Sequence, residues 1–193
     1  MTTPRCIAFA GTELLAQGSP SHVAHAVRMR LDQDDHAPIC VLDADTSAPI
    51  DFVLQGTPDE VAAMAEQQYA ATDDQAPARR RGRPRLGVTA REITLLPRHW
   101  DWLAAQPGGA SVTIRKLVDT ARKASAGSDA IRVTQDSTHR FLYTVAGDYP
   151  GFEEVARALY AWDRTHLGEL LSAWPEDIVA HAHRLLSACD QPE

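Results

Sequence analysis

Five arginines occupy positions within the seven residues 79–85, in a stretch of the chain that has no apolar periodicity. Residues 73–87 are polar, contain proline and carry dense positive charge, so they are unsuited to a hydrophobic core. We therefore expect a linker or arm here, which divides the chain into separately patterned parts. The predicted parts are an N-terminal domain at 1–72, the arm at 73–87, a central module at 88–126 and a C-terminal region at 127–193.

The composition is that of a folded protein. Apolar residues make up 44% and charged residues 23% of the 193 residues, which is ordinary for globular chains and sufficient for one domain or two small ones. The chain has no run of 18 apolar residues and no secretion-signal pattern, so we expect a cytoplasmic location and no membrane partner. Cys6, Cys40 and Cys189 are odd in number and lack CxxC spacing, which predicts reduced thiols.

Charge is distributed unevenly along the chain. The net charge of −7 taken alone argues against binding to closely spaced phosphates. Between Arg79 and Lys123, however, 11 basic and three acidic residues give a local charge of +8, which leaves −15 elsewhere. This asymmetry predicts that the central segment contacts nucleic acid. A solvated linker and a patch that binds an acidic protein surface remain open as alternatives.

The N-terminal region alternates strand-like and helix-like patterns. Short apolar runs predict strands at residues 6–10, 39–42 and 50–54. Apolar spacing predicts one helix from Val23 to Leu31 behind a Ser21 cap, and another behind the Thr57–Glu60 segment. Together these elements predict a small α+β domain.

The central module has the order strand, helix, turn, helix. A strand is predicted at 88–96, a helix begins at Pro97, residues 107–109 form the turn, and Ser111 caps the second helix. Trp102 lies two positions from Trp100 and must face elsewhere, which makes it a candidate for an interface or for a buried groove between domains.

The C-terminal region is predicted to be mainly helical. A loop is expected at 125–129, and two short strands at 131–133 and 141–145. Apolar stripes then predict three helices, one containing Phe152 and Leu159, one containing Leu167 and Leu171, and one containing Ile178 and Leu185. The whole chain is thus expected to be an α+β protein.

The arm contains a short recognisable motif. Its core is Arg81, Gly82, Arg83, Pro84 and Arg85. This motif resembles the AT-hook, in which such an arm lies in the minor groove of A/T-rich DNA. Glycine allows a close approach to the groove floor, proline keeps the arm extended, and arginine is attracted by the negative potential of a narrow groove.

The segment from Arg91 to Lys123 resembles the ribbon-helix-helix family of bacterial DNA-binding proteins. The matching features are Leu96-Pro97, Gly109-Ala110-Ser111 and Ile114-Arg115-Lys116-Leu117-Val118. The resemblance implies a homodimer in which two chains pair one strand each, and a phosphate bound near the amides of Ser111 and Val112.

The predicted ribbon departs from the family pattern. Arg91, Ile93 and Leu95 share one face, and Glu92, Thr94 and Leu96 share the other, so neither face is a typical base reader. Binding dominated by phosphate contacts or by the arm is therefore favoured. The predicted DNA-binding residues are Arg79, Arg80, Arg81, Gly82, Arg83, Pro84, Arg85, Arg91, Arg98, Ser111, Val112, Arg115 and Lys116.

Over its whole length the chain also resembles an uncharacterised bacterial protein family that shares the Gly-Arg-Pro-Arg-Leu-Gly and Leu-Leu-Pro-Arg-His-Trp segments. That resemblance implies no particular activity.

Catalytic and metal-binding patterns are weak in this sequence. The chain has no G-x-S-x-G elbow, phosphate-binding loop or dinucleotide fingerprint. The closely spaced histidines (His22 and His25, His181 and His183) and aspartates (Asp43, Asp45 and Asp51) lack the partners of known metal sites. We therefore expect no enzymatic activity, no cofactor and no bound metal.

The sequence as a whole predicts a homodimeric, regulator-like DNA-binding protein. The terminal regions would dimerise, sense a ligand or recruit a partner protein. The alternative is a non-enzymatic protein-interaction module whose basic segment binds an acidic partner. DNA and RNA are not distinguished by these patterns.

Overall fold

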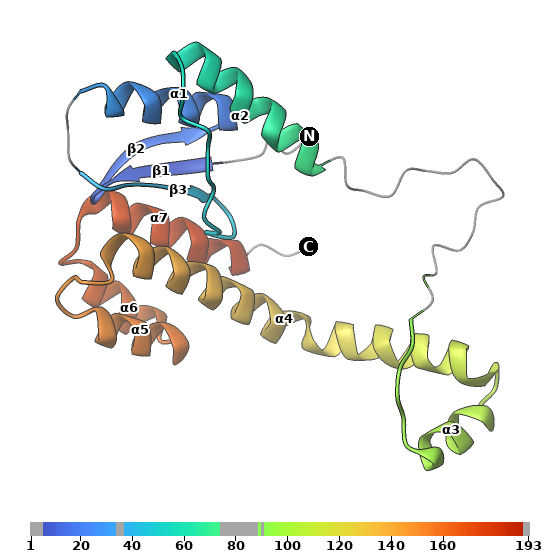
Figure 1. The fold of residues 1–193 in the computed structure, drawn as a ribbon. Helices are drawn as coiled ribbons and strands as arrows, with labels where there is room; N and C mark the ends of the chain where they lie inside the picture. The colour runs from blue at the N-terminus through green and yellow to red at the C-terminus, as the bar shows by residue number, and fades with distance from the viewer. Residues whose placement is uncertain (1–5, 34–36, 74–88, 90, 191–193) are drawn as a thin grey trace. The chain divides into compact units, whose positions relative to one another are not determined.

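A computed structural model of the chain describes residues 6–33, 37–73, 89 and 91–190 (Figure 1). It confirms the α+β class. The elements are β1 (Cys6–Ala10), β2 (Glu13–Gly18), α1 (Pro20–Leu31), β3 (Ile39–Asp43), α2 (Pro58–Asp73), α3 (Pro97–Ala104), α4 (Gly109–Ala146), α5 (Phe152–Tyr160), α6 (Arg164–Leu171), α7 (Glu176–Ser187) and a 3-10 turn, η1 (Ala188–Asp190).

The chain divides into two compact units. Unit 1 comprises residues 1–76 and 131–193, and unit 2 comprises residues 77–130. Helix α4 supplies residues to both units.

The sheet of unit 1 is antiparallel, in the order β2-β1-β3. Strands β1 and β3 lie where the sequence predicts them, but β2 is a strand that the sequence analysis missed. The predicted strand at 50–54 is wrong. Only Pro49 forms an isolated bridge, to Leu42, and the chain then leaves the sheet. Ile50, Phe52 and Leu54 instead pack against the cores between the sheet and the N-terminal helices.

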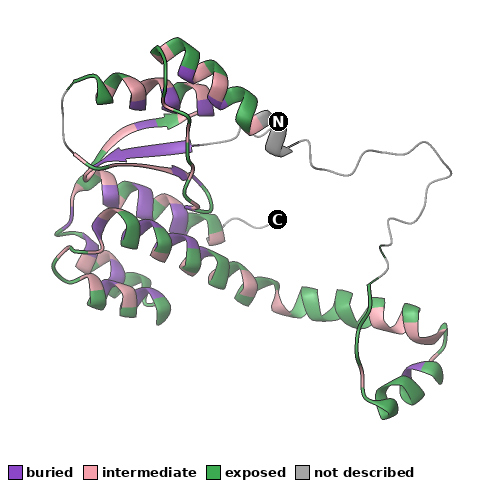
Figure 2. Ribbon diagram, viewed as in Figure 1, coloured by how far each residue is buried: buried purple, intermediate pink, exposed green. Residues whose placement is uncertain are grey.

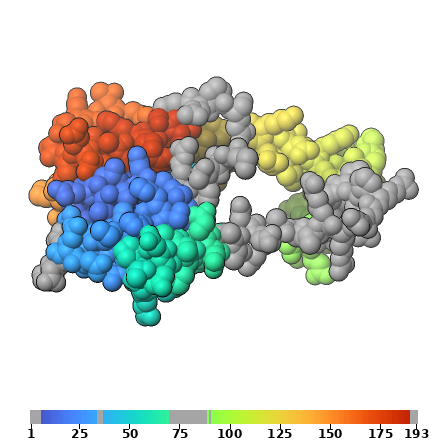
Figure 3. All heavy atoms as spheres, turned by 90° about the horizontal axis from the view of Figure 1, so that it is seen from above, coloured from blue at the N-terminus to red at the C-terminus, as the bar shows by residue number. Residues whose placement is uncertain are grey.

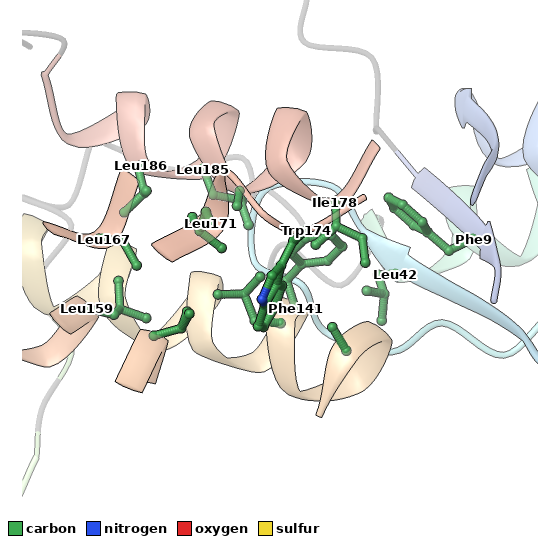
Figure 4. Packing of buried hydrophobic residues seen from close by; sticks show 14 of the residues in the cluster. Phe9, Leu42, Phe141, Leu159, Leu167, Leu171, Trp174, Ile178, Leu185 and Leu186 are labelled. Carbon is green, nitrogen blue, oxygen red and sulfur yellow. The ribbon is translucent and has the colours of Figure 1, made fainter. Parts of the chain in front are cut away.

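Both faces of the sheet are covered by helices (Figure 1). On one face, Cys6 and Ala8 of β1 pack with Val23 and Val27 of α1, and α2 lies against α1. On the other face, residues of β1 and β3 join the helical core, as Figure 4 shows for Phe9 and Leu42. The buried members of this larger core include Ile7, Phe9, Leu42, Phe141, Leu142, Leu159, Leu167, Leu171, Ile178 and Leu185.

The N-terminal and C-terminal segments that the sequence analysis separates therefore share one hydrophobic core. Phe9 of β1 lies 5.3 Å from Phe141 of α4, measured between ring centroids. In Figure 3 the blue N-terminal segment and the red C-terminal helices likewise lie side by side. A small sheet without its helical cover could not bury both faces, which explains why the two segments fold together.

Two helix caps illustrate how local sequence defines these elements. Helix α1 begins at Pro20, so its cap is Ser19 and not the predicted Ser21. The Oγ of Ser19 accepts a hydrogen bond from the amide of His22 at 3.2 Å. Helix α2 begins behind the predicted Thr57–Glu60 segment, which forms a capping box. The amide of Thr57 donates to a Glu60 carboxylate oxygen at 2.9 Å, and the amide of Glu60 donates to Thr57 Oγ1 at 3.4 Å.

Helix α4 continues through three segments for which the sequence analysis predicts other structures. The loop at 125–129 and the strands at 131–133 and 141–145 are all wrong, since these residues are helical. Ser125 Oγ donates to an Asp129 carboxylate oxygen at 2.7 Å, which supports the helix across its small residues. Farther along, Thr134, Thr138, Phe141 and Leu142 are buried at helical spacing, so packing overrides the strand-like residue types.

The three C-terminal helices form as predicted. The buried residues of α5 include Val155 and Leu159, those of α6 are Leu167 and Leu171, and those of α7 include Ile178 and Leu185. None of the described helices is both long enough and apolar enough to cross a membrane.

Candidate nucleic-acid interface and apolar groove

Seven of the predicted DNA-binding residues lie outside the described part of the chain. They are Arg79, Arg80, Arg81, Gly82, Arg83, Pro84 and Arg85. The other six, which are Arg91, Arg98, Ser111, Val112, Arg115 and Lys116, belong to the described residues of unit 2.

The segment before α3 is not a strand in the single chain. Residues 91–96 have no regular secondary structure, which contradicts the predicted strand, and residues 88 and 90 lie outside the described residues. None of residues 91–95 has a hydrogen bond to another described residue. A strand needs a second backbone to pair with, and the described part of unit 2 offers none.

Unit 2 buries very little of its apolar surface (Figure 2). Leu103 of α3, which is 4% exposed, is its only buried side chain among the described residues. Trp102, Leu117 and Val118 are each about half exposed, at 52%, 52% and 50%. This grouping distinguishes the surface of unit 2 from an ordinary protein surface, where exposed large apolar side chains are scattered singly.

These side chains surround a groove of about 350 Å³, which we call the apolar groove. It is lined by Ile93, Leu95, His99, Trp102, Leu103, Ile114, Leu117 and Val118. Ile93 and Leu95 line it together because alternate residues of an extended segment face the same way. Trp102, predicted as an interface candidate, lies in this groove, whereas Trp100 is not among the lining residues.

The turn between the two helices depends on two glycines with positive φ. Gly108 has φ +90° and Gly109 has φ +72°. A Cβ added at Gly108 would lie 3.1 Å from the Val112 side chain, so this position also lacks space. Helix α4 begins at Gly109, so the predicted cap at Ser111 is wrong. The Ser111 amide nevertheless belongs to the first three residues of α4, whose amides have no partner within the helix, whereas Val112 is the fourth residue, where bonding within a helix begins.

The cationic residues of α4 are separate from the groove. Ile114, Leu117 and Val118 line the groove, whereas Arg115 and Lys116 are exposed and do not. Arg115 donates from Nε to the carbonyl oxygen of Ser111 at 3.0 Å, which keeps its guanidinium near the start of the helix. Arg91, Arg98, Arg122 and Lys123 are also exposed. The same short helical segment thus has one apolar face and several cationic side chains outside it.

A family model matches residues 5–186 and is described as "Uncharacterized protein conserved in bacteria (DUF2239)". The chain belongs to this bacterial family. The family description names no activity. No curated protein and no solved structure matches this DUF2239 protein.

Two of the aspartates considered for metal binding, Asp43 and Asp45, have structural partners. Asp43 is partly buried, but hydrogen bonds from Thr46 and from the Asp45 amide hold its pKa below the usual range. Asp45 accepts from Arg184 at 3.0 Å. Within the described residues, no three His, Cys, Asp or Glu side chains form a group that could hold a metal ion. All three cysteines are free.

Proposed function

We propose that this DUF2239 protein is a homodimeric, regulator-like DNA-binding protein, in which unit 2 and the arginine arm contact DNA. The observation that carries the proposal is the combination in unit 2 of an uncovered apolar groove and exposed cationic side chains. A groove of this kind supports self-association, and the cationic residues support binding to phosphates.

A second copy of the same chain is the proposed cover of the groove. Fully burying one Leu or Val side chain contributes roughly 1.5–3 kcal/mol, so covering Leu117 and Val118 would add substantial stability. The backbone of residues 91–95 has unused hydrogen-bonding groups beside the groove-lining Ile93 and Leu95. In a two-fold dimer the same segment of the partner copy supplies complementary groups, and the same apolar surface meets itself.

The proposed DNA contacts are mainly contacts to the phosphate backbone. Arg98, Arg115 and Lys116 are exposed, and the first-turn amides of α4 add donors suited to an anion. Because Ile93 and Leu95 face the groove, Glu92 and Thr94 face away from it. A carboxylate on that face disfavours phosphate. Sequence preference is therefore assigned to the arm, whose motif suits the minor groove of A/T-rich DNA.

The competing proposal is a protein-interaction module. Its supporting observation is the apolar groove, which would equally accept an amphipathic helix of another protein. In that case the basic segment would bind an acidic surface of the partner rather than a nucleic acid.

Fluorescence anisotropy of labelled A/T-rich and G/C-rich duplexes, measured across a salt series, tests the proposal. The variant has Arg81, Arg83 and Arg85 changed to alanine. The control variant changes three exposed arginines of unit 1 to alanine, namely Arg132, Arg157 and Arg164. It loses the same amount of positive charge as the arm variant. A single-stranded RNA of the same length separates DNA binding from RNA binding.

We expect salt-sensitive binding that prefers A/T-rich duplex, is lost in the arm variant and persists in the control, because each phosphate contact releases counterions. No binding near physiological salt would reject the proposal and favour the protein-interaction module. Equal losses in the two variants would reject the role of the arm.

A further inference from the structure

A second hollow lies in unit 1, at the edge of the sheet formed by β3. Its volume is about 430 Å³, and it is bounded by β3, by segment 49–54, by the end of α1 and by Thr144 of α4. The segment that forms its outer wall is the one that leaves the sheet after Pro49 instead of continuing as a strand. The hollow therefore results from the departure of this segment from β3.

The walls of this hollow are mainly apolar and incompletely buried. Leu31 at the end of α1 is 45% exposed, and Val41, Ile50 and Leu54 are half-buried although they pack against the cores of the unit. A molecule within the hollow would complete the burial of these side chains. Hydrophobic burial favours such filling in proportion to the apolar area removed from water.

The edge of β3 adds one specific polar group. The Gly11 amide donates to the Pro38 carbonyl oxygen, so the backbone hydrogen-bonding groups of residues 38, 40 and 42 point toward β1. The backbone N–H and C=O of Val41 therefore point away from β1, toward the open edge of the sheet. The Val41 carbonyl oxygen accepts from Ile50 at 2.9 Å. The Val41 amide has no hydrogen-bond acceptor among the described residues, which leaves a donor at the wall of the hollow.

The charge around the hollow restricts the class of ligand. Among the described residues that line it, Asp51 has the only carboxylate and is exposed, and none is a lysine or an arginine. An anion would meet this negative charge without a compensating cation. Sites for small molecules commonly combine apolar walls with a few placed polar groups and fall in a volume range of roughly 300–1,000 Å³.

We propose that the hollow between β3 and segment 49–54 binds a small, uncharged and mainly apolar molecule that carries a hydrogen-bond acceptor for the Val41 amide. The site lies wholly within unit 1 and does not depend on DNA binding. It gives the described fold a place for a small-molecule signal.

Titration of the full-length protein with cyclohexanone, followed by amide and methyl NMR, tests this site. We expect saturable shifts at the Val41 amide and at the methyl groups of Ile50 and Leu54. Cyclohexanecarboxylate, which has the same ring and a negative charge, should bind more weakly. The variant Val41→Phe fills the hollow and should weaken binding on the order of ten-fold or more.

Two further variants make the result decisive. Thr144→Phe fills the hollow from α4 at an exposed position, so it blocks the site without disturbing the core. Val133→Phe places the same ring on α4 at a residue that is 63% exposed and outside the hollow, and should leave binding unchanged. Unchanged binding to both filling variants, shifts confined to the apolar groove of unit 2, or shifts that do not saturate would overturn the proposal.

Discussion

The two units of this chain differ in how completely they bury their own apolar side chains. In unit 1 a sheet is enclosed between two layers of helices, and side chains from β1, β3, α4, α5, α6 and α7 are fully buried (Figure 4). In unit 2 only Leu103 is buried among the described residues. A folded core needs large buried area to offset the entropy of ordering the chain. This difference in burial is the reason for the proposal that unit 2, unlike unit 1, is completed by a partner.

Matched leucine substitutions should separate the two units most strongly. Leu171→Ala in unit 1 removes a fully buried side chain and should lower the free energy of unfolding by roughly 2–5 kcal/mol. Leu117→Ala in unit 2 removes a side chain that is 52% exposed in the single chain. It should change the free energy of unfolding by about 0.5 kcal/mol or less. Denaturant unfolding at low protein concentration, followed by circular dichroism, measures both. Similar losses would contradict the comparison.

The core of unit 1 also contains a titratable group. His181 is 5% exposed, its Nε2 has no hydrogen-bond partner among the described residues, and its ring lies 4.5 Å from that of Phe141. Burial, assisted by the charge of Arg184, lowers its pKa from 6.5 to about 4. Protonation therefore favours the unfolded chain. The contribution of neutral His181 is fully present above pH 6.5 and is lost as the pH falls toward about 4.

Between pH 6.5 and about 4, protonation of His181 is expected to lower the free energy of unfolding by about 3 kcal/mol. Unfolding free energies measured at several pH values between 7 and 4 test it, with His181→Phe as the variant that keeps an aromatic ring but cannot titrate. The variant should show a shallower decline than the native protein. Parallel declines would show that His181 does not titrate as proposed.

The turn of unit 2 allows a smaller test of local structure. Gly108→Ala and Gly109→Ala both place a Cβ at positive φ, at a cost of roughly 1–2 kcal/mol each. Gly108→Ala should cost more, because its Cβ would also meet Val112, whereas a Cβ at Gly109 would have no atom of a described residue within 4 Å apart from its chain neighbours and the backbone of its own helix. Hydrogen exchange of the α3 and α4 amides reports the difference. Faster exchange in Gly109→Ala than in Gly108→Ala would disprove this account of the turn.

The smallest expected effect is at the capping box of α2. Thr57→Ala removes the acceptor of the Glu60 amide and the hydroxyl that donates to its carboxylate, and should cost about 1 kcal/mol. Thr120→Ala on the exposed middle of α4 is a matched control and should be neutral within about 0.5 kcal/mol. Thermal unfolding measures the stability of both variants. Equal effects would show that the capping box does not stabilise α2.

Local sequence patterns predicted the elements whose signals are short-range. The capping box at Thr57 and the apolar stripe of α7 needed no knowledge of the rest of the chain. The failures arose where long-range packing decides. Phe141 and its neighbours have the residue types of a strand, but the helix is favoured because it places Phe141 against Phe9 from the far end of the sequence.

The candidate site was predictable only in part. The positive charge of unit 2 and the Gly108–Gly109 turn are visible in the sequence. The grouping of Ile93, His99 and Leu117 around one groove was not, since it depends on how segment 91–96 folds onto two helices. The period-two spacing of Ile93 and Leu95 was the signal that could have indicated a shared face.

The molar mass of the native protein in solution tests the central claim most directly. Light scattering coupled to size-exclusion chromatography at micromolar concentration should give twice the chain mass of 21.1 kDa. Leu117→Asp, which places a charge in the apolar groove, should give a monomer. Val133→Asp, on the same helix but outside the groove, should remain a dimer. A monomeric native protein, or a Leu117→Asp variant that stays dimeric, would contradict the claim that a second copy covers the groove.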